Sequence, residues 1–426
     1  MIARLRHANG EQRKLLFSLG TNFLTRIPGA VGLLWFLPLL RFGLGTDDYA
    51  NLFASMALGT ATTFLIGGFS VIGRRIVGAA YAQQDHADEA NGFASLVIAN
   101  LMATGIACAI IVIYCQMRAV SAEILLISLL PAVGAFLMTF DNVRLAYNEH
   151  YVTAILQLIL QTAIYTVGFF VPLTRHNIIF ASLIIQGHYM LSSLITCGML
   201  LRGRPYLFGG RPVMVWQVIR EGAILAMADG FLMATLGLLV VWLQAVSNPT
   251  TSAWFATVVR LFQTFLTPVI LLLMPLSSYI RLLWHRKSVT RQQIFAKVLF
   301  WSGIGYGMFV AISLFIASRF YVDDLLHLPA PGRWFQILPI FLLFGAIVAY
   351  KGYSSIAYIV MDGSTHLSSW TTIVISVAVV LGAVASFAVE PLDVINIYSV
   401  TTGLLVIVVL FWNAARFVRV SPLPGE

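Results

Sequence analysis

Hydrophobic residues occur in long runs that short polar links separate. A membrane-spanning helix needs about 20 mostly apolar residues to cross a hydrocarbon core of ~30 Å. Twelve runs meet this length, so the pattern predicts an all-α polytopic membrane protein of about twelve transmembrane helices. They cover residues 15–40, 49–72, 93–115, 121–143, 151–172, 177–201, 217–246, 252–279, 297–318, 335–360, 364–388 and 394–415.

The twelve predicted helices divide into two sets of six. The link at 202–216 is rich in glycine, proline and arginine, which is typical of a hinge between two halves. The second and eighth runs open alike, with YANLFAS from Tyr49 and SAWFAT from Ser252. Parallel repeats are a common plan in transporters. We therefore predict an N-terminal lobe at 1–201, a cytoplasmic linker, and a C-terminal lobe at 217–426, arranged around a central cavity.

Composition agrees with a membrane protein, and charge predicts its orientation. The chain of 426 residues is 59% hydrophobic and 10% charged, whereas soluble proteins carry about 25% charged residues. A large soluble domain is therefore excluded. Of the 26 lysines and arginines, 18 lie on the predicted side of the two termini and 5 on the other. Positive loops stay in the cytoplasm, so both termini are predicted to be cytoplasmic.

Three cations fall inside the predicted helices: Arg26, Arg260 and Lys351. A charge at mid-membrane costs roughly 2.5–3.5 kcal/mol on insertion scales, so it normally faces protein or water. Arg26 shares a helical face with Asn22, and the rise per residue places it ~17 Å from the cytoplasmic end. We predict a cavity-lining role for Arg26 and Arg260. Lys351 either joins them or extends toward the cytoplasm.

The carboxylates leave two interpretations open. Asp229 lies ~18 Å into the seventh run, at a depth similar to that of Arg26. It either forms a structural ion pair with Arg26 or serves as a protonatable site for ion coupling. Glu221, Asp141 and Arg144 lie near predicted membrane edges, and we interpret them as solvated surface charges.

Polar stripes follow two neighbouring predicted helices. Gln157, Gln161 and Tyr165 recur every four residues, and the next run carries a stripe made of Gln186, Tyr189, Ser193 and Thr196. Such stripes either join helices or line a wet path. Together with the buried cations they favour a cavity. Guanidinium groups suit phosphate oxygens, so this cavity would accommodate a diphosphate group.

Motifs of nucleotide and metal chemistry are absent from the sequence. There is no G-x-x-x-x-G-K-[ST] and no H-E-x-x-H, so neither ATP hydrolysis nor a catalytic metal is predicted. The glycines at 303, 305 and 307 lie in an apolar run, where close helix packing explains them better than a nucleotide loop. We therefore expect no catalytic residues, no cofactor and no enzymatic activity.

The segment from Leu33 to Asp85, LLWFLPLLRFGLGTDDYANLFASMALGTATTFLIGGFSVIGRRIVGAAYAQQD, resembles a known family. It is similar to polysaccharide flippases of the multidrug/oligosaccharidyl-lipid/polysaccharide exporter superfamily. These proteins likewise have a long first helix, an acidic turn before a tyrosine, and a glycine-rich second helix that runs into basic residues. Here alanine follows Tyr49 where glycine is usual, and the C-terminal half matches more loosely.

The resemblance implies a function. Such flippases move an undecaprenyl-diphosphate-linked oligosaccharide across the bacterial inner membrane by alternating access, for polysaccharide biosynthesis. Arg26 and Arg260 match positions implicated in engaging the anionic lipid-linked sugar, and Asn22, Gln157 and Gln161 would suit its hydroxyl groups. The partners implied are the lipid-linked oligosaccharide, the bilayer, a coupling proton or sodium ion, and polysaccharide assembly proteins, with no nucleic acid.

Other classes of protein fit less well. A drug or cation antiporter of the same superfamily would favour acidic over basic cavity residues. A major-facilitator transporter would carry Gly-x-x-x-Asp-Arg in the link between its second and third helices, which this chain lacks. A glycan polymerase usually needs a large outer loop with catalytic charges, and here only Asp323 and Asp324 hint at one.

Overall fold

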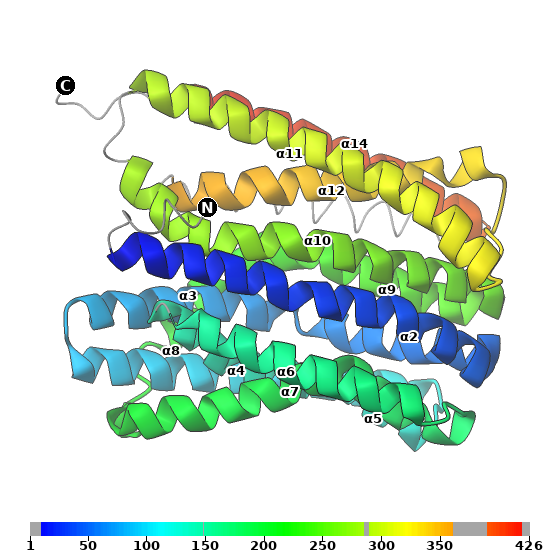
Figure 1. Ribbon diagram of the computed structural model, residues 1–426, viewed down its shortest axis with the longest axis horizontal. Coiled ribbons are helices and arrows are strands. Elements are labelled where there is room, and N and C mark those ends of the chain that lie inside the picture. Colours follow the sequence, from blue (N-terminus) through cyan, green and yellow to red (C-terminus); the bar gives the residue numbers. More distant parts are fainter. Residues whose placement is uncertain (1–9, 148, 285–288, 361–389, 420–426) are drawn as a thin grey trace. The chain divides into compact units, whose positions relative to one another are not determined.

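The computed structural model describes residues 10–147, 149–284, 289–360 and 390–419, and those residues form helices and turns without a strand (Figure 1). The helical fold class predicted from the hydrophobic runs is therefore confirmed. The chain forms two compact units, Met1–Ala256 and Thr257–Glu426. Each unit is considered by itself below.

Unit 1 contains the N-terminal helices. It comprises α2 (Gly10–Thr62), α3 (Phe64–Ala82), α4 (His86–Met117), α5 (Ala122–Ala146), α6 (His150–Phe170), α7 (Ile178–Gly203), α8 (Val215–Leu225) and α9 (Phe231–Val246), with short η1 (Arg175–Asn177), η2 (Pro205–Gly209) and η3 (Ala226–Gly230).

The first two predicted runs meet at a glycine kink. Gly45 has φ 80° and interrupts the helical backbone of α2. Glycine adopts this conformation without a steric penalty. Tyr49 follows it and is fully buried. A second break at Thr63 separates α2 from α3, and the Thr63 hydroxyl donates to the backbone oxygen of Thr60 at 2.8 Å.

Glycines let the helices of unit 1 approach closely. A Cβ at Gly32 of α2 would lie 2.8 Å from the ring of Tyr165 on α6, closer than side chains can pack. At Gly68 of α3, a Cβ would clash with the backbone of Gly222 on α8. Small residues at helix contacts are typical of membrane proteins, where packing rather than water exclusion holds helices together.

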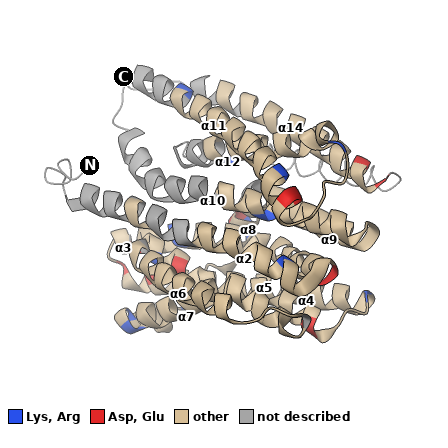
Figure 2. Cartoon of the chain, turned by 45° about the vertical axis from the view of Figure 1, so that its right-hand side comes forward, with Lys and Arg blue, Asp and Glu red and all other residues tan. Residues whose placement is uncertain are grey.

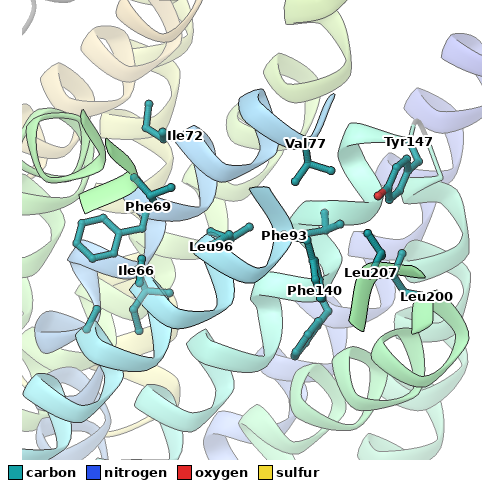
Figure 3. Packing of buried hydrophobic residues seen from close by; sticks show 14 residues of the cluster. Ile66, Phe69, Ile72, Val77, Phe93, Leu96, Phe140, Tyr147, Leu200 and Leu207 are labelled. Carbon is teal, nitrogen blue, oxygen red and sulfur yellow. The ribbon is translucent and has the colours of Figure 1, made fainter. Parts of the chain in front are cut away.

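An apolar cluster joins α3, α4, α5, α7 and α8 (Figure 3). Phe93 and Phe140 lie at its centre with ring centroids 6.2 Å apart, and Leu200 lies beside them. Buried aromatic pairs of this kind add about 0.5–1.5 kcal/mol beyond their area. The cluster fixes the helix ends that carry the polar groups described below.

A π-helical turn interrupts the α-helical geometry of the seventh predicted run. This turn is η3, and it lies between α8 and α9. Helical backbone therefore covers the predicted run at 217–246, with one wider turn inside it that sequence reasoning missed. Both α8 and α9 belong to unit 1: the amide of Gln244 on α9 donates to Asn51 Oδ1 on α2 at 2.9 Å.

Unit 2 is built around one central helix. Its elements are α10 (Pro249–Trp284, which begins in the last residues of unit 1), α11 (Val289–Ala317), η4 (Ser318–Leu325), α12 (Trp334–Val360) and α14 (Pro391–Arg419). In the α12 segment Trp334–Tyr353 about two thirds of the residues of its apolar window are buried, more than in any other described apolar span. Its Phe344 ring stacks on Phe262 of α10 at 4.3 Å.

The glycine-rich stretch of α11 packs on α12, as predicted. A Cβ at Gly345 would lie 2.7 Å from the backbone oxygen of Gly307. A Cβ at Gly303 would lie 3.3 Å from the oxygen of Ala349, whereas Gly305 faces open space. Two of the three glycines therefore permit helix contact.

Nine helices of the described residues are long and apolar enough to cross a membrane, and Leu232–Val246 is a shorter apolar helix. Charged residues are sparse along the described helices, and many of them lie near helix ends (Figure 2). The chain is therefore a multi-pass membrane protein. The predicted helix at 364–388 lies outside the described residues. The predicted lobes on either side of 202–216 stay a prediction; the two compact units divide after Ala256.

Candidate functional site

Three of the predicted site residues can be placed on the backbone only. Asn22 and Arg26 lie in α2, and Asp229 lies in the π-helical turn η3. Their side chains lie outside the described part of the structure. Whether Arg26 pairs with Asp229 or faces a cavity therefore stays open. Asp229 does occupy an irregular turn, and such turns are frequent at functional sites.

Arg260 is a partly buried cation of α10. Its Nη1 donates to Gln263 Oε1 at 3.2 Å, while its Nε is buried without a hydrogen-bond partner. Among the residues that the structure describes, no carboxylate forms an ion pair with it. The predicted polar stripe continues along the same helix, where Thr257 is buried and Thr264 donates to the backbone oxygen of Arg260.

Lys351 is buried within unit 2. The residue is 6% exposed, and its neighbours Tyr350 and Tyr353 on α12 are buried as well. The side chain thus lies among protein groups rather than extending into solvent. Its part in binding stays a prediction.

Gln157 and Gln161 lie on α6 and are buried, at 5% and 4% exposure. The Gln161 amide nitrogen lies 3.2 Å from Nε2 of His188 on α7. It can donate to that nitrogen when the imidazole is neutral and carries its proton on Nδ1. The Gln161 side chain also packs directly over Gly29 of α2, three residues after Arg26. The stripe of α6 therefore faces both α2 and α7.

His188 was not singled out by sequence reasoning. It is 1% exposed, and its ring lies 4.0 Å from that of Tyr189 and 6.0 Å from that of Tyr165. The sequence signal that could have identified it is its spacing, because His188, Ser192 and Thr196 recur every four residues. In the structure all three are buried. This face lies beside the predicted stripe of α7.

Asp141 is buried, and the prediction of a solvated surface charge is wrong. The residue is 5% exposed. Its Oδ2 accepts a hydrogen bond from Ser193 and its Oδ1 accepts one from Thr196, both at 2.5 Å, and Thr153 donates to Oδ1 at 3.4 Å. Hydroxyl groups of α6 and α7 thus replace water around this carboxylate of α5, which joins the three helices.

Arg144 is buried too, which corrects the second surface prediction. It is 4% exposed, and its Nη1 lies 3.4 Å from Glu149 Oε2. Arg204 donates to the same carboxylate at 2.6 Å and lies over the Tyr147 ring, 3.8 Å from its centroid. Burial lowers the pKa of Arg204, but the bond and the charge of Glu149 outweigh this and leave it above the ordinary value.

Glu89 holds the end of this network. It is fully buried at the start of α4 and accepts from Tyr147 Oη at 2.5 Å and from Tyr206 Oη at 2.7 Å. Burial and the bond to Glu89 raise the pKa of Tyr206 to about 12. Glu89 and Glu149 thus connect three parts of unit 1: the start of α4, the turn between α5 and α6, and the segment after α7. The third surface prediction, Glu221, is about one-third exposed and forms an ion pair with Arg75 of α3.

The charges of the two units differ in what surrounds them. In unit 1, Asp141 and Glu89 accept from hydroxyl groups, and Arg144 pairs with Glu149. In unit 2, the described partner of Arg260 is the amide of Gln263, and its Nε has no hydrogen-bond partner. Guanidinium groups of this kind suit carboxylates and phosphates. Among the described residues no group of three or more histidines, cysteines, aspartates and glutamates could hold a metal ion.

These helices, spans and buried charges define a polytopic membrane protein with the fold of a transporter. Its fold is similar to that of an inward-facing multidrug resistance MATE family transporter of the MOP superfamily, with a TM-score of 0.55, 14% identity, and coverage of 92% of this chain and 98% of that one.

Two further structures show the same likeness. For the eukaryotic MATE transporter AtDTX14 the TM-score is 0.55 at 12% identity, with 96% of this chain and 98% of that chain covered. For MATE in complex with MaL6 it is 0.52 at 16% identity, with the same coverage. No protein-family profile matches the sequence, and no curated protein matches it. At these identities the likeness establishes the fold alone.

Proposed function

We propose that this protein is a transporter that flips an undecaprenyl-diphosphate-linked oligosaccharide across the bacterial inner membrane by alternating access, for polysaccharide biosynthesis. It moves its substrate without covalent change, and both of its termini lie in the cytoplasm. The fold supports a transporter, and the predicted excess of positive charge on one face supports the orientation.

The observation that carries the substrate class is the environment of Arg260. A guanidinium inside a membrane helix is expensive unless its charge is used. Here its described partner is the neutral amide of Gln263, and its Nε has no hydrogen-bond partner. A diphosphate oxygen would satisfy that donor and balance the charge. Arg26 on α2 is the second arginine of the proposed substrate site.

The sugar needs groups of a different kind. Gln157 and Gln161 bring buried amides to α6, and Asn22 is the corresponding amide of α2. Amides donate and accept, which suits sugar hydroxyl groups. Lys351 adds a further cation to the proposed site. Asp229 is the proposed site for a coupling proton or sodium ion, because its carboxylate lies in an irregular turn of a membrane helix.

A multidrug or cation antiporter is the second candidate. Two observations favour it: the likeness to MATE transporters, and the buried carboxylate Asp141 in unit 1. A cationic substrate, however, gives no reason for a partly buried arginine that pairs with no carboxylate of the described residues. The two candidates therefore make opposite demands on Arg260.

Reconstituted protein can separate the two. The test measures the flipping of a fluorescent diphosphate-linked oligosaccharide in proteoliposomes, and pH-gradient-driven uptake of a cationic dye in the same vesicles. We expect the protein to flip the oligosaccharide, Arg260→Ala to lower the flipping rate strongly, and neither protein to take up the dye. Arg319→Ala is the matched control, because Arg319 is half exposed and pairs with Asp323. Dye uptake without flipping would overturn the flippase proposal in favour of the antiporter.

A further inference from the structure

The link between α7 and α8 carries an exposed apolar surface. Phe208, Val213 and Trp216 are 72%, 66% and 73% exposed, although all three are large hydrophobic residues. They fall within nine residues of one another and lie outside the apolar spans. We call this surface, together with the exposed arginines around it, the linker face.

The backbone beneath the linker face is fixed to α4. The backbone nitrogen of Arg211 donates to Asn91 Oδ1 at 2.8 Å, and that of Met214 donates to Ser95 Oγ at 3.0 Å. Gly210 packs directly against the backbone oxygen of Ala90. Leu207 and Val218 are buried beneath. The exposed side chains therefore project from an ordered support, not from a loose loop.

The linker face is purely cationic. Between Glu149 and Glu221 the sequence contains no aspartate or glutamate. Arg202, Arg211 and Arg220 are exposed, and no carboxylate of the described residues pairs with them. By contrast, Arg204 of the same segment is committed to Glu149. Three arginines thus flank the apolar side chains, and none of the three pairs with a carboxylate of the described residues.

The position of the linker face points to its partner. The apolar span Ile178–Gly203 ends directly before it, so the segment lies where a membrane helix meets water. Tryptophan and phenylalanine prefer that interface, and arginines beside it attract anionic lipid headgroups. We propose that the linker face binds anionic phospholipid of the adjacent leaflet, with Trp216 and Phe208 among the acyl carbonyls and the three arginines on the headgroup phosphates. This holds for either candidate function, because it does not involve the substrate.

Lipid-attached quenchers test the proposal on the full-length protein in nanodiscs. Bromine-labelled phosphatidylglycerol and bromine-labelled phosphatidylcholine are compared at equal mole fraction. The fluorescence that Trp216→Phe removes defines the signal of Trp216. We expect the phosphatidylglycerol to quench this signal more strongly, and the preference to fall roughly fivefold for each arginine changed to glutamine, equivalent to ~1 kcal/mol per charge at a membrane surface.

The variants are Arg220→Gln alone and Arg202→Gln/Arg211→Gln/Arg220→Gln together. Arg118→Gln is the matched control: Arg118 is also exposed at a helix end, but follows α4. It should leave the preference unchanged. The single variant keeps the test valid if the triple variant does not fold. Equal quenching by the two lipids would overturn the proposal, and so would quenching by neither, which would indicate that a protein partner or water covers the linker face.

Discussion

Two arginines inside membrane helices, Arg144 and Arg260, have different surroundings. Arg144 lies on α5 with Glu149 as its ionic partner, and Glu149 also holds Arg204. Arg260 lies on α10, and its described partner is the neutral amide of Gln263. The Nε of both arginines is buried without a hydrogen-bond partner, so the difference lies in the carboxylate: Arg144 has one in its own unit, and Arg260 has none among the described residues.

This difference in partners indicates how a buried charge that holds the fold together can be told from one that is available to a ligand. A buried charge that has a counter-ion mainly fixes the packing of the elements around it. Removing one partner leaves the other charge buried and uncompensated, which is strongly destabilising. A buried charge without a counter-ion lowers stability unless something arrives to balance it. The described buried charges of Asp141, Arg144 and Glu89 therefore connect the helices of unit 1, whereas the proposed role of Arg260 is to bind an anion.

Arg144→Ala should have the largest effect on stability. The change leaves Glu149 with Arg204 alone and removes a side chain that is buried among α5 and the turn after it. We expect a loss of about 2–3 kcal/mol, below the 3–5 kcal/mol of fully buried pairs because Glu149 is partly exposed. Thermal unfolding in detergent measures this. We also expect transport per folded molecule to be preserved. An unchanged melting temperature would contradict the structural role of Arg144.

Arg260→Ala should lower transport without lowering stability. Hydrogen bonds to a charged group contribute about 1.5–3 kcal/mol, so we expect roughly a 10- to 100-fold loss of flipping rate. The melting temperature should stay constant or rise. Arg260→Lys keeps the charge but lacks the planar fork, and should recover only part of the rate. A large loss of stability in Arg260→Ala would place Arg260 in the same class as Arg144.

Asp141→Asn extends the comparison to a carboxylate. An amide oxygen can still accept from Thr196 or Ser193, but the amide nitrogen cannot accept from the other hydroxyl. We therefore expect a loss of about 1–2 kcal/mol in unfolding free energy. If Asp141 instead carries a coupling proton, as the antiporter candidate would have it, the variant also loses pH-gradient-driven uptake. Measuring stability and uptake together distinguishes the two roles.

Tyr206→Phe should have the smallest effect, and one that depends on pH. Losing the hydrogen bond to Glu89 should cost about 1 kcal/mol at neutral pH. The pKa of Tyr206 is raised from 10 to about 12 in the folded protein, so the unfolded chain loses its proton first. The stabilisation that Tyr206 supplies is therefore present below pH 10 and is lost as the pH rises toward 12. The variant should flatten this part of the stability curve, and a curve unchanged by the variant would contradict the assignment.

The sequence predicted the membrane helices because their apolar runs are long and unambiguous. It also placed Arg260 on a polar stripe, and it predicted close helix packing for Gly303 and Gly307, whose partner proved to be α12. These features depend on residues close together in the chain. The fold class followed from them, whereas the partner helix of each glycine depends on how distant segments pack.

The errors concern partners that are distant in sequence. Asp141 was predicted to be solvated because it lies near a helix end, but its donors come from Thr153, Ser193 and Thr196. Glu89 was not considered, because the tyrosines that bind it lie 58 and 117 residues away. Whether an edge charge meets water or hydroxyl groups depends on the packing of other helices, which periodicity does not report.

The π-helical turn η3 determines how this part of the chain responds to the deletion of a residue. Such a turn behaves as one extra residue inserted into an α-helix, and each residue of an α-helix advances by about 100°. Side chains before Ala226 and after Gly230 are therefore out of phase by about that angle. The wider turn absorbs this extra residue, so deleting one residue from it would restore a regular α-helix and leave the side chains of α9 facing the neighbours they have now. A deletion within α9 would instead turn every following side chain by about 100°.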